Sequence, residues 1–63
     1  MDEILFFEVY RDGEGRYRWR LRYGERIVAE SEAYKEKRHC TAELKFIRSQ
    51  AARIPIKDTT GDP

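Results

Sequence analysis

The strongest constraint on the fold is a run of eight residues in which arginine alternates with a large apolar side chain. Residues 16–23 read Arg-Tyr-Arg-Trp-Arg-Leu-Arg-Tyr. Successive side chains of a β-strand point to opposite faces, so this run predicts a strand with one apolar face and one cationic face. The apolar face would carry Tyr17, Trp19, Leu21 and Tyr23, and the cationic face would carry Arg16, Arg18, Arg20 and Arg22.

Two further strands are expected, one on each side of this run in the sequence. Residues 4–10 are rich in β-branched and aromatic side chains, which are typical of strands. Asp12-Gly13 follows, and this pair between apolar segments indicates a hairpin, because glycine accepts a positive φ at no steric cost. A second tight turn at Gly24 leads into a third predicted strand at residues 26–31. Two short loops in succession predict an antiparallel meander.

After the third strand the apolar period changes to that of a helix. The spacing of the apolar residues is four, three and four, which puts them on one helical stripe; they are Cys40, Leu44, Ile47 and Ala51. We expect this helix at residues 36–52. It should end before Ile54, because the residue that precedes a proline, here Pro55, is biased away from helical angles.

These elements predict an α+β fold in which a three-stranded antiparallel meander is followed by one α-helix (βββα). The whole chain, residues 1–63, then forms a single domain. Residues 54–56 are interpreted as a short extended segment. Residues 58–63 are polar and are expected to form a frayed tail.

The register of the hairpins decides which side chains meet on the buried face. We predict a three-residue first loop, which places Leu5, Phe7 and Val9 beside Leu21, Trp19 and Tyr17 and sets Glu8 opposite Arg18, so that both faces are satisfied. The same reasoning, applied to the second hairpin, predicts that Ile27 and Ala29 lie on the inner face and that Glu30 lies near Arg18. The predicted core is Leu5, Phe7, Val9, Tyr17, Trp19, Leu21, Ile27, Ala29, Cys40, Leu44 and Ile47.

The small size of the chain predicts a homodimer. A domain of about 60 residues buries only about 60% of the surface of its unfolded chain, and such domains usually need a disulfide, a metal or a partner subunit. One cysteine and one histidine among 63 residues rule out an intrachain disulfide and make a structural zinc site implausible. Association with a second copy is the remaining route.

Composition excludes several classes of function. A formal net charge of +1 gives no electrostatic signature for nucleic acid or an anionic membrane. No apolar run approaches the ~20 residues that a membrane span needs, and the acidic start Met1-Asp2-Glu3 lacks the basic region of a signal peptide. We therefore expect a cytoplasmic protein without a membrane partner, and the unpaired cysteine agrees with a reducing compartment.

The motifs also resemble those of the YegP-like family, small proteins without an established activity. The resemblance covers roughly residues 6–48 and rests on Phe7-Glu8-Val9-Tyr10, Gly15-Arg16-Tyr17-Arg18-Trp19-Arg20-Leu21, Gly24-Glu25, Ser31-Glu32-Ala33-Tyr34, Lys37 and Cys40. It implies a βββα unit, which some members carry in tandem and which a single-unit chain would assemble as an intertwined homodimer. Ala33, Glu36 and Ala42-Glu43 depart from the usual family pattern, and the last change argues against a shared polar site on the helix.

The arginine row is the most suggestive candidate for a site. Arg18, Arg20 and Arg22, with Phe6 and Tyr10 on the same face, could hold single-stranded nucleic acid through phosphate contacts and base stacking. A solvated face with cross-strand pairs from glutamates is favoured by the net charge near zero. A third possibility is that this face belongs to the dimer interface, where arginine and aromatic residues are enriched.

The remaining candidates favour packing over chemistry. Trp19 and Tyr17 lie on the predicted core face, and Cys40 is interpreted as a buried structural cysteine, because neighbouring helical positions such as His39 point about 100° away. His39 and Phe46, on the opposite side of the helix, could form a small docking patch or be singly exposed. No catalytic residue, metal ligand or cofactor-binding residue is predicted. The leading hypothesis is a non-enzymatic homodimeric module with a structural or interaction role.

Overall fold

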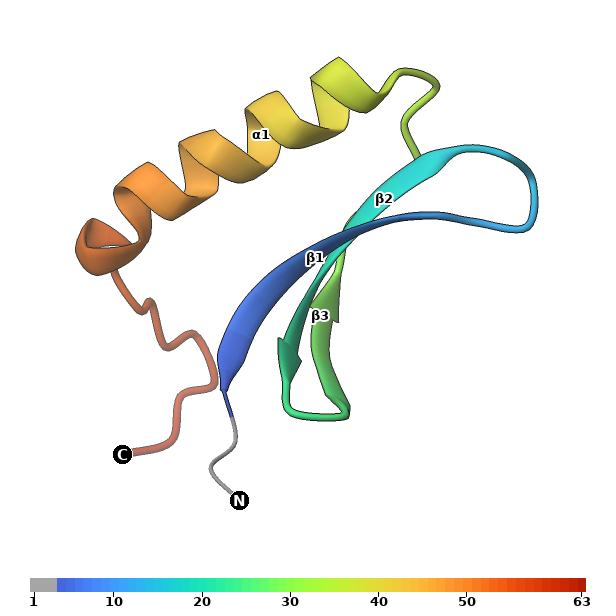
Figure 1. Cartoon of the computed structure of the whole chain (residues 1–63). Helices are drawn as coiled ribbons and strands as arrows, with labels where there is room; N and C mark the ends of the chain where they lie inside the picture. Colours follow the sequence, from blue (N-terminus) through green and yellow to red (C-terminus); the bar gives the residue numbers. More distant parts are fainter. Residues whose placement is uncertain (1–3) are drawn as a thin grey trace.

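The structure is a computed structural model that describes residues 4–63. Three antiparallel strands lie side by side in chain order, and a single helix crosses one face of the sheet (Figure 1). The strands are β1 (Leu5–Arg11), β2 (Tyr17–Tyr23) and β3 (Arg26–Glu30). Each lies within one residue of its predicted bounds, so the meander is confirmed.

The helix α1 spans Lys37–Gln50 and continues into one 3₁₀ turn, η1, at Ala51–Arg53. Its N-cap, Glu36, has extended backbone angles (φ −120°, ψ 135°) and makes no side-chain cap hydrogen bond. The chain returns to an extended conformation at Ile54 (φ −71°, ψ 117°), which is the conformation that Pro55 imposes on its predecessor. The predicted βββα order is therefore confirmed.

The predicted register of the first hairpin is wrong by two residues. Phe7 pairs with Leu21, Val9 with Trp19, and Glu8 with Arg20 rather than Arg18. A shift of two residues leaves every side chain on its expected face, because the side-chain period of a strand is two. The apolar and cationic faces of β2 are as predicted, while each cross-strand partner differs.

The turn between β1 and β2 explains this register. The strands close on the pair Arg11–Tyr17, which leaves a longer loop than the three residues predicted. Asp12 organises that loop: its Oδ1 accepts hydrogen bonds from the backbone N–H groups of Glu14 (2.9 Å) and Arg16 (3.0 Å). Gly15 takes a φ of 79° there, a region that favours glycine. Arg16 therefore lies in the turn rather than in the strand.

The second hairpin contains an irregularity that the sequence analysis missed. Leu21 pairs with Ala29, but the next pair is Arg22 with Ile27, so Val28 is an extra residue in β3. Such a bulge breaks the alternation of side chains. Ile27 therefore lies in the row of Arg22 and is 49% exposed, and its assignment to the core was wrong. Glu30 pairs with Arg20, not with Arg18.

The helix is tied to the sheet at its N-terminal end. Tyr17 and Tyr34 exchange two backbone hydrogen bonds of 2.8 Å, and the N–H of Ser31 donates to the carbonyl of Trp19 at 2.9 Å. These hydrogen bonds hold the segment between β3 and α1 alongside β2. In Figure 1 the helix starts close to β2 and its C-terminal end lies farther from the sheet.

The core is correspondingly small. Cys40 is the only fully buried residue within 4–63. Most other predicted core residues are half-buried, namely Phe7, Val9, Tyr17, Trp19, Leu21, Leu44 and Ile47. Leu5, at 60% exposure, and Ala29 are exposed and were wrongly placed in the core. Leu5 lies at the start of β1 beside the exposed Tyr23, and Ala29 lies on the edge strand β3.

Candidate functional site

The structure brings the five proposed binding residues together on the outer face of the sheet. Phe6 pairs with Arg22, Tyr10 pairs with Arg18, and Arg20 lies between these two rows on β2. The strand alternation alone accounts for this arrangement, because all five positions share one parity across the β1–β2 register. We call this surface the arginine face.

Carboxylates neutralise the arginines of this face. The Nε of Arg20 donates to Oε1 of Glu8 at 2.6 Å, and Nη1 of Arg22 approaches the same oxygen at 3.4 Å. The Nε of Arg18 donates to Oδ2 of Asp12 at 2.9 Å. Asp12 was not predicted as a partner, because the shorter loop that was assumed did not bring it back over β2. Three guanidinium groups thus share two carboxylates.

Aromatic rings fill the spaces between these ion pairs. The guanidinium carbon of Arg20 lies 4.1 Å from the centre of the Tyr10 ring, and that of Arg22 lies 5.4 Å from the centre of the Phe6 ring. The Tyr10 hydroxyl donates to Oε1 of Glu30 at 2.7 Å, which links all three strands. The Tyr10 and Phe6 rings are therefore each already in contact with one of the protein's own cations.

The titration of these groups follows from their partners. The hydrogen bond from Arg20 holds the pKa of Glu8 below its ordinary value, and the hydrogen bond from Arg18 does the same for Asp12. The hydrogen bond to the Glu30 carboxylate raises the pKa of Tyr10. These shifts strengthen the charge state that each group already has at neutral pH, which is the behaviour of a structural ion-pair network.

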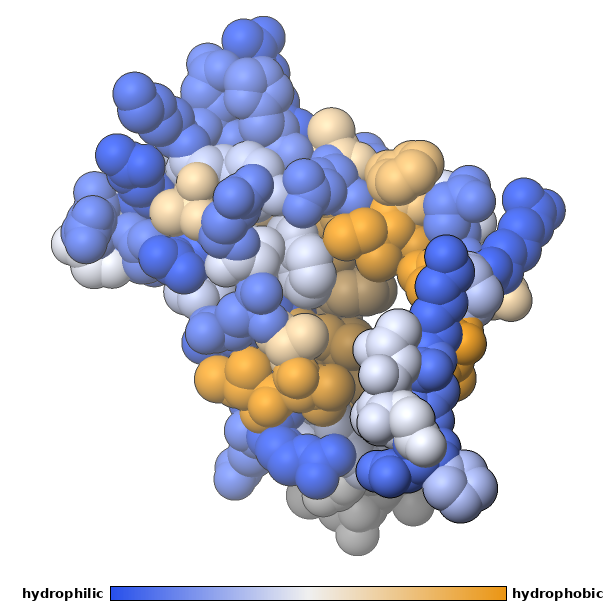
Figure 2. Space-filling model, turned by 180° about the vertical axis from the view of Figure 1, so that it is seen from behind, coloured by the Kyte–Doolittle hydropathy of each residue, from blue (hydrophilic) through white to orange (hydrophobic). Residues whose placement is uncertain are grey.

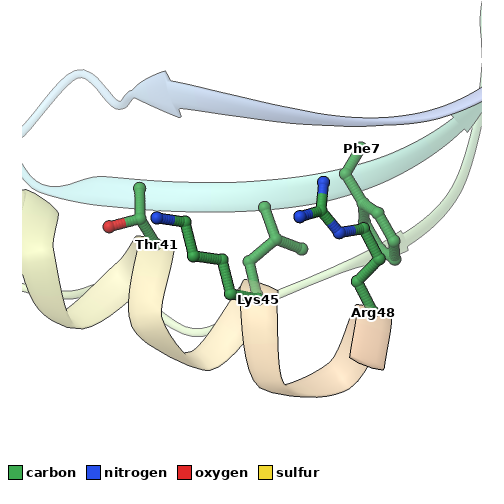
Figure 3. A pocket seen from close by; sticks show the side chains of 5 residues that line it. Phe7, Thr41, Lys45 and Arg48 are labelled. Atoms are coloured by element: carbon green, nitrogen blue, oxygen red, sulfur yellow. The ribbon is translucent and has the colours of Figure 1, made fainter. Parts of the chain in front are cut away.

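The inner side of the molecule is apolar and open. Between α1 and β1 lies a cavity of about 170 Å³ lined by Phe7, Thr41, Leu44, Lys45 and Arg48. Figure 3 shows Phe7 projecting from the sheet toward Arg48 of the helix, while the Lys45 side chain extends toward Thr41. Apolar side chains would be expected at these positions in a closed core. Instead, α1 contributes the long cationic side chains of Lys45 and Arg48.

A second cavity of about 460 Å³ continues this space toward the end of the helix. Its lining is mostly apolar and consists of Leu5, Phe6, Phe7, Leu21, Arg48 and Ala51. Figure 2, seen from behind, shows hydrophobic surface on both sides of a hollow. We call the two cavities together the wedge. Phe7 and Arg48 line both of them, and the role of Arg48 was not foreseen from the sequence.

Two buried polar atoms beside the helix lack hydrogen-bond partners among the described residues. They are Nε1 of Trp19 and the hydroxyl oxygen of Tyr34. Burial, with a smaller contribution from the Glu43 carboxylate, raises the pKa of Tyr34 to about 12. Trp19 otherwise packs as predicted, with its ring edge-to-face against Phe7 at 5.7 Å and 86°. A buried donor that has no partner at all costs about 1–3 kcal/mol.

The cysteine and the histidine do not form a reactive pair. Cys40 is fully buried, and burial raises the pKa of its thiol, which disfavours the nucleophilic thiolate. The His39 side chain is largely exposed and lies 3.5 Å from a carboxylate oxygen of Glu36. Phe46 is 65% exposed on the outer side of α1, so the docking patch around it stays a prediction.

Metal sites and membrane spans are two further possibilities for residues 4–63. No three histidine, cysteine, aspartate or glutamate side chains in this part of the chain are grouped as metal ligands. Neither does this part contain a helix with the length and apolarity that a membrane crossing requires.

A family model described as a domain of unknown function (DUF1508) matches residues 12–58. The chain belongs to this family. The match begins at the Asp12 turn and ends beyond α1, so it includes β2, β3, the helix and the extended segment after it. The resemblance to YegP-like proteins is thereby confirmed, and the family as such assigns no activity.

Individual relatives extend the match over most of the chain. A UPF0339 protein of Neisseria meningitidis serogroup B is 36% identical over 55 residues, which cover 86% of this chain and 98% of the relative. A UPF0339 protein of Mesorhizobium japonicum is 28% identical over 54 residues, covering 86% and 93% of the two chains. The NMR solution structure of a protein from Haloferax volcanii superimposes with a TM-score of 0.72 at 26% identity, covering 94% of this chain and all of the other.

Proposed function

We propose that the protein acts as a non-enzymatic homodimer, a module with a structural or interaction role. The observation that carries this proposal is the open inner face: one residue of the described chain is fully buried, and large apolar side chains stay accessible. A core this small gives little stability against the conformational entropy of folding. A second copy of the chain could supply the missing apolar surface, because it is present wherever the chain itself is present and at the same concentration.

A twofold dimer would close both wedges at once. In such an interface the same patch of each copy meets its equivalent, so every apolar group contributed to the partner is matched by one received. Leu5 and Tyr23, at 60% and 41% exposure, lie at the end of the sheet that α1 leaves uncovered. Their burial would supply the apolar area that the single chain lacks.

The charged groups support a role other than catalysis. A general acid or base works best when its pKa lies near the operating pH. Glu8 and Asp12 have lowered pKa values, and the tyrosines Tyr10 and Tyr34 have raised ones, so all four move away from neutrality. The thiol of Cys40 is buried.

The arginine face supports the second candidate, weak binding of single-stranded nucleic acid, less well. Arg18, Arg20 and Arg22 would have to exchange their carboxylate partners for phosphates. Binding of this kind would fall steeply with added salt. Absence of oligonucleotide binding even in low salt would exclude it.

Sedimentation velocity over a concentration series tests the dimer directly. The expected species has twice the 7.6 kDa mass of the chain, and a folded monomer with a cooperative thermal transition would overturn the proposal. Leu5→Asp should produce a monomer. Because this side chain is 60% exposed in the single chain, its loss acts through the interface rather than through the fold of one copy.

Phe46→Asp is the matched control. It introduces the same charge at a similarly exposed apolar position, 65%, but on the outer side of α1. The dimer should persist in this variant. If Phe46→Asp and not Leu5→Asp produced monomers, the interface would lie on the outer side of the helix, and the wedge would not be the contact surface.

A further inference from the structure

The near-zero net charge of the chain conceals an uneven distribution of charge along it. Residues 37–53, which form α1 and η1, contain five lysine and arginine side chains and one glutamate, a net charge of +4. The rest of the chain contains eight basic and eleven acidic side chains, a net charge of −3. The helix therefore presents a local positive potential that attracts anions, although the molecule as a whole is almost neutral.

The cations of the helix are also less completely paired than those of the arginine face. Arg18, Arg20 and Arg22 each lie within 3.4 Å of a carboxylate oxygen. Of the five lysine and arginine side chains in residues 37–53, Arg38 alone forms an ion pair within residues 4–63, with Glu36 at 3.2 Å. Both members of that pair are largely exposed, at 76% and 51%. Exposed pairs contribute little to stability, so Arg38 can exchange its partner for another anion.

One row of helical residues faces away from the sheet and combines two of these cations with an aromatic ring. The buried Cys40 and the half-buried Leu44 mark the side of α1 that packs toward the sheet (Figure 1). The residues on the opposite side follow at spacings of four, four, three and four, and all of them are exposed; they are Arg38, Ala42, Phe46, Ser49 and Arg53. We call these five residues the outer row.

Phe46 is the one large apolar side chain of the outer row, and its neighbours leave it open, at 65% exposure. Ala42, one turn before it, has a side chain that ends at Cβ. The hydroxyl of Ser49, one turn after it, donates to the carbonyl oxygen of Phe46 at 2.7 Å and so is folded back onto the helix. A membrane or a protein partner normally needs a wider apolar surface than one ring. A base of a single-stranded nucleic acid needs one ring face, with cations nearby for the phosphates.

We propose that the outer row binds single-stranded nucleic acid, with a base stacked on Phe46 and with phosphates held by Arg38 and Arg53. The two arginines lie eight and seven residues from Phe46, which places them about 10–12 Å to either side along the helix axis. A strand laid along α1 therefore meets a cation on each side of the stacked base. This site lies on a different surface from the arginine face, and it does not depend on the homodimer.

Fluorescence anisotropy of a labelled oligothymidylate of about twelve nucleotides tests the site, with the full chain titrated at several salt concentrations. We expect the logarithm of the association constant to fall against the logarithm of the salt concentration with a slope of about −1.4, because each of two phosphate contacts on a single strand contributes about −0.7. Absence of binding in low salt would overturn the proposal. Binding to phosphatidylserine vesicles without binding to the oligonucleotide would also overturn it and would indicate a membrane surface.

Phe46→Ala separates base stacking from the attraction between charges. The association constant should fall roughly tenfold while the salt slope stays the same, because the ring contacts no phosphate. Phe46→Tyr keeps an aromatic ring and should bind within about twofold of wild type. Both variants should keep their fold, because the side chain is 65% exposed, and circular dichroism checks this. Wild-type affinity of Phe46→Ala would contradict the proposal.

Arg53→Gln tests one of the phosphate contacts and should make the salt slope shallower by about 0.7. Arg16→Gln is the matched control and should leave the slope unchanged. Arg16 is also exposed and makes no ion pair within residues 4–63, but it lies in the turn between β1 and β2. A shallower slope in Arg20→Gln but not in Arg53→Gln would place binding on the arginine face and would overturn this proposal. Sedimentation velocity on the same samples reports the oligomeric state separately, so a failure of the dimer is distinguished from a failure of nucleic-acid binding.

Discussion

The two faces of the sheet differ in how completely a single chain satisfies them. On the outer face, Arg20 and Arg22 share the Glu8 carboxylate, and each also lies over an aromatic ring. On the inner face, Phe7 and Trp19 meet edge-to-face, but the space beside them stays open. The charged groups of the outer face are satisfied within one chain, whereas the apolar inner face stays partly open.

This difference has a simple physical origin. Long charged side chains reach their neighbours along and across strands, so a flat sheet alone can neutralise them. Apolar side chains need a second layer, and α1 provides that layer only where it is tied to β2. Among the described residues α1 is the one α-helix, and it leaves part of the inner side uncovered. The surface that stays open on the inner side is therefore mostly apolar, even though charged residues make up 40% of the chain.

Trp19→Ala should have the largest effect of any single substitution in the sheet. Removal of a packed tryptophan costs on the order of 3–5 kcal/mol, which is comparable to the whole stability of a domain of this size. We expect the variant to be unfolded at room temperature, as far-ultraviolet circular dichroism would show. Arg22→Ala, at the corresponding place on the outer face, should lower the thermal midpoint only slightly. Similar midpoints for the two variants would remove the distinction between the faces.

Much of the fold could be predicted because its signals are local. The alternation in residues 16–23 fixed the strand and its two faces, and the spacing of Cys40, Leu44 and Ile47 placed the helix. The five residues of the arginine face were grouped correctly for the same reason. Their ion-pair partners were not, because a register shift of two residues preserves every face and leaves no trace in the alternation.

Features that depend on the third dimension were missed. Ile27, Val28 and Ala29 are all apolar, so the sequence there does not alternate and gives no indication of which residue is the extra one in the bulge. The angle at which α1 leaves the sheet is likewise set by packing at its N-terminal end, around Cys40, and not by helical periodicity. The wedge and the place of Arg48 in it follow from that angle.

Gly15→Ala should have an effect of intermediate size, and it tests the turn that aligns the two faces. The glycine has a φ of 79°, so a side chain there is strained by about 1 kcal/mol even though the nearest atom to an added Cβ is 3.9 Å away. Gly13→Ala is the matched control in the same loop. It has no positive φ, and a Cβ there would meet nothing within 4 Å. Equal urea midpoints for the two variants would show that the loop does not hold the register.

The smallest effect is expected from protonation of the outer face, and its sign is determined by the carboxylates. The pKa of Glu8 is lowered in the folded chain from the ordinary 4.5, because Arg20 and Arg22 donate to its carboxylate. A group of this kind stabilises the fold above the pKa of the unfolded state, and the contribution is lost as the pH falls through the lower pKa of the folded state. Stability from the arginine face should thus be complete at neutral pH and decline below about pH 4.5.

The comparison of wild type with Glu8→Gln isolates this contribution, since other groups titrate alike in both chains. The thermal midpoint of the variant should lie below that of wild type at pH 7, and the gap should narrow as the pH falls toward 2. Both proteins are compared at one concentration, because association of the kind proposed would make the midpoint concentration-dependent. A gap that stayed constant from pH 7 to pH 2 would mean that the Glu8 carboxylate contributes nothing through its charge. In that case the ion pairs of Glu8 would not stabilise the outer face, and the contrast with the open inner face would be lost.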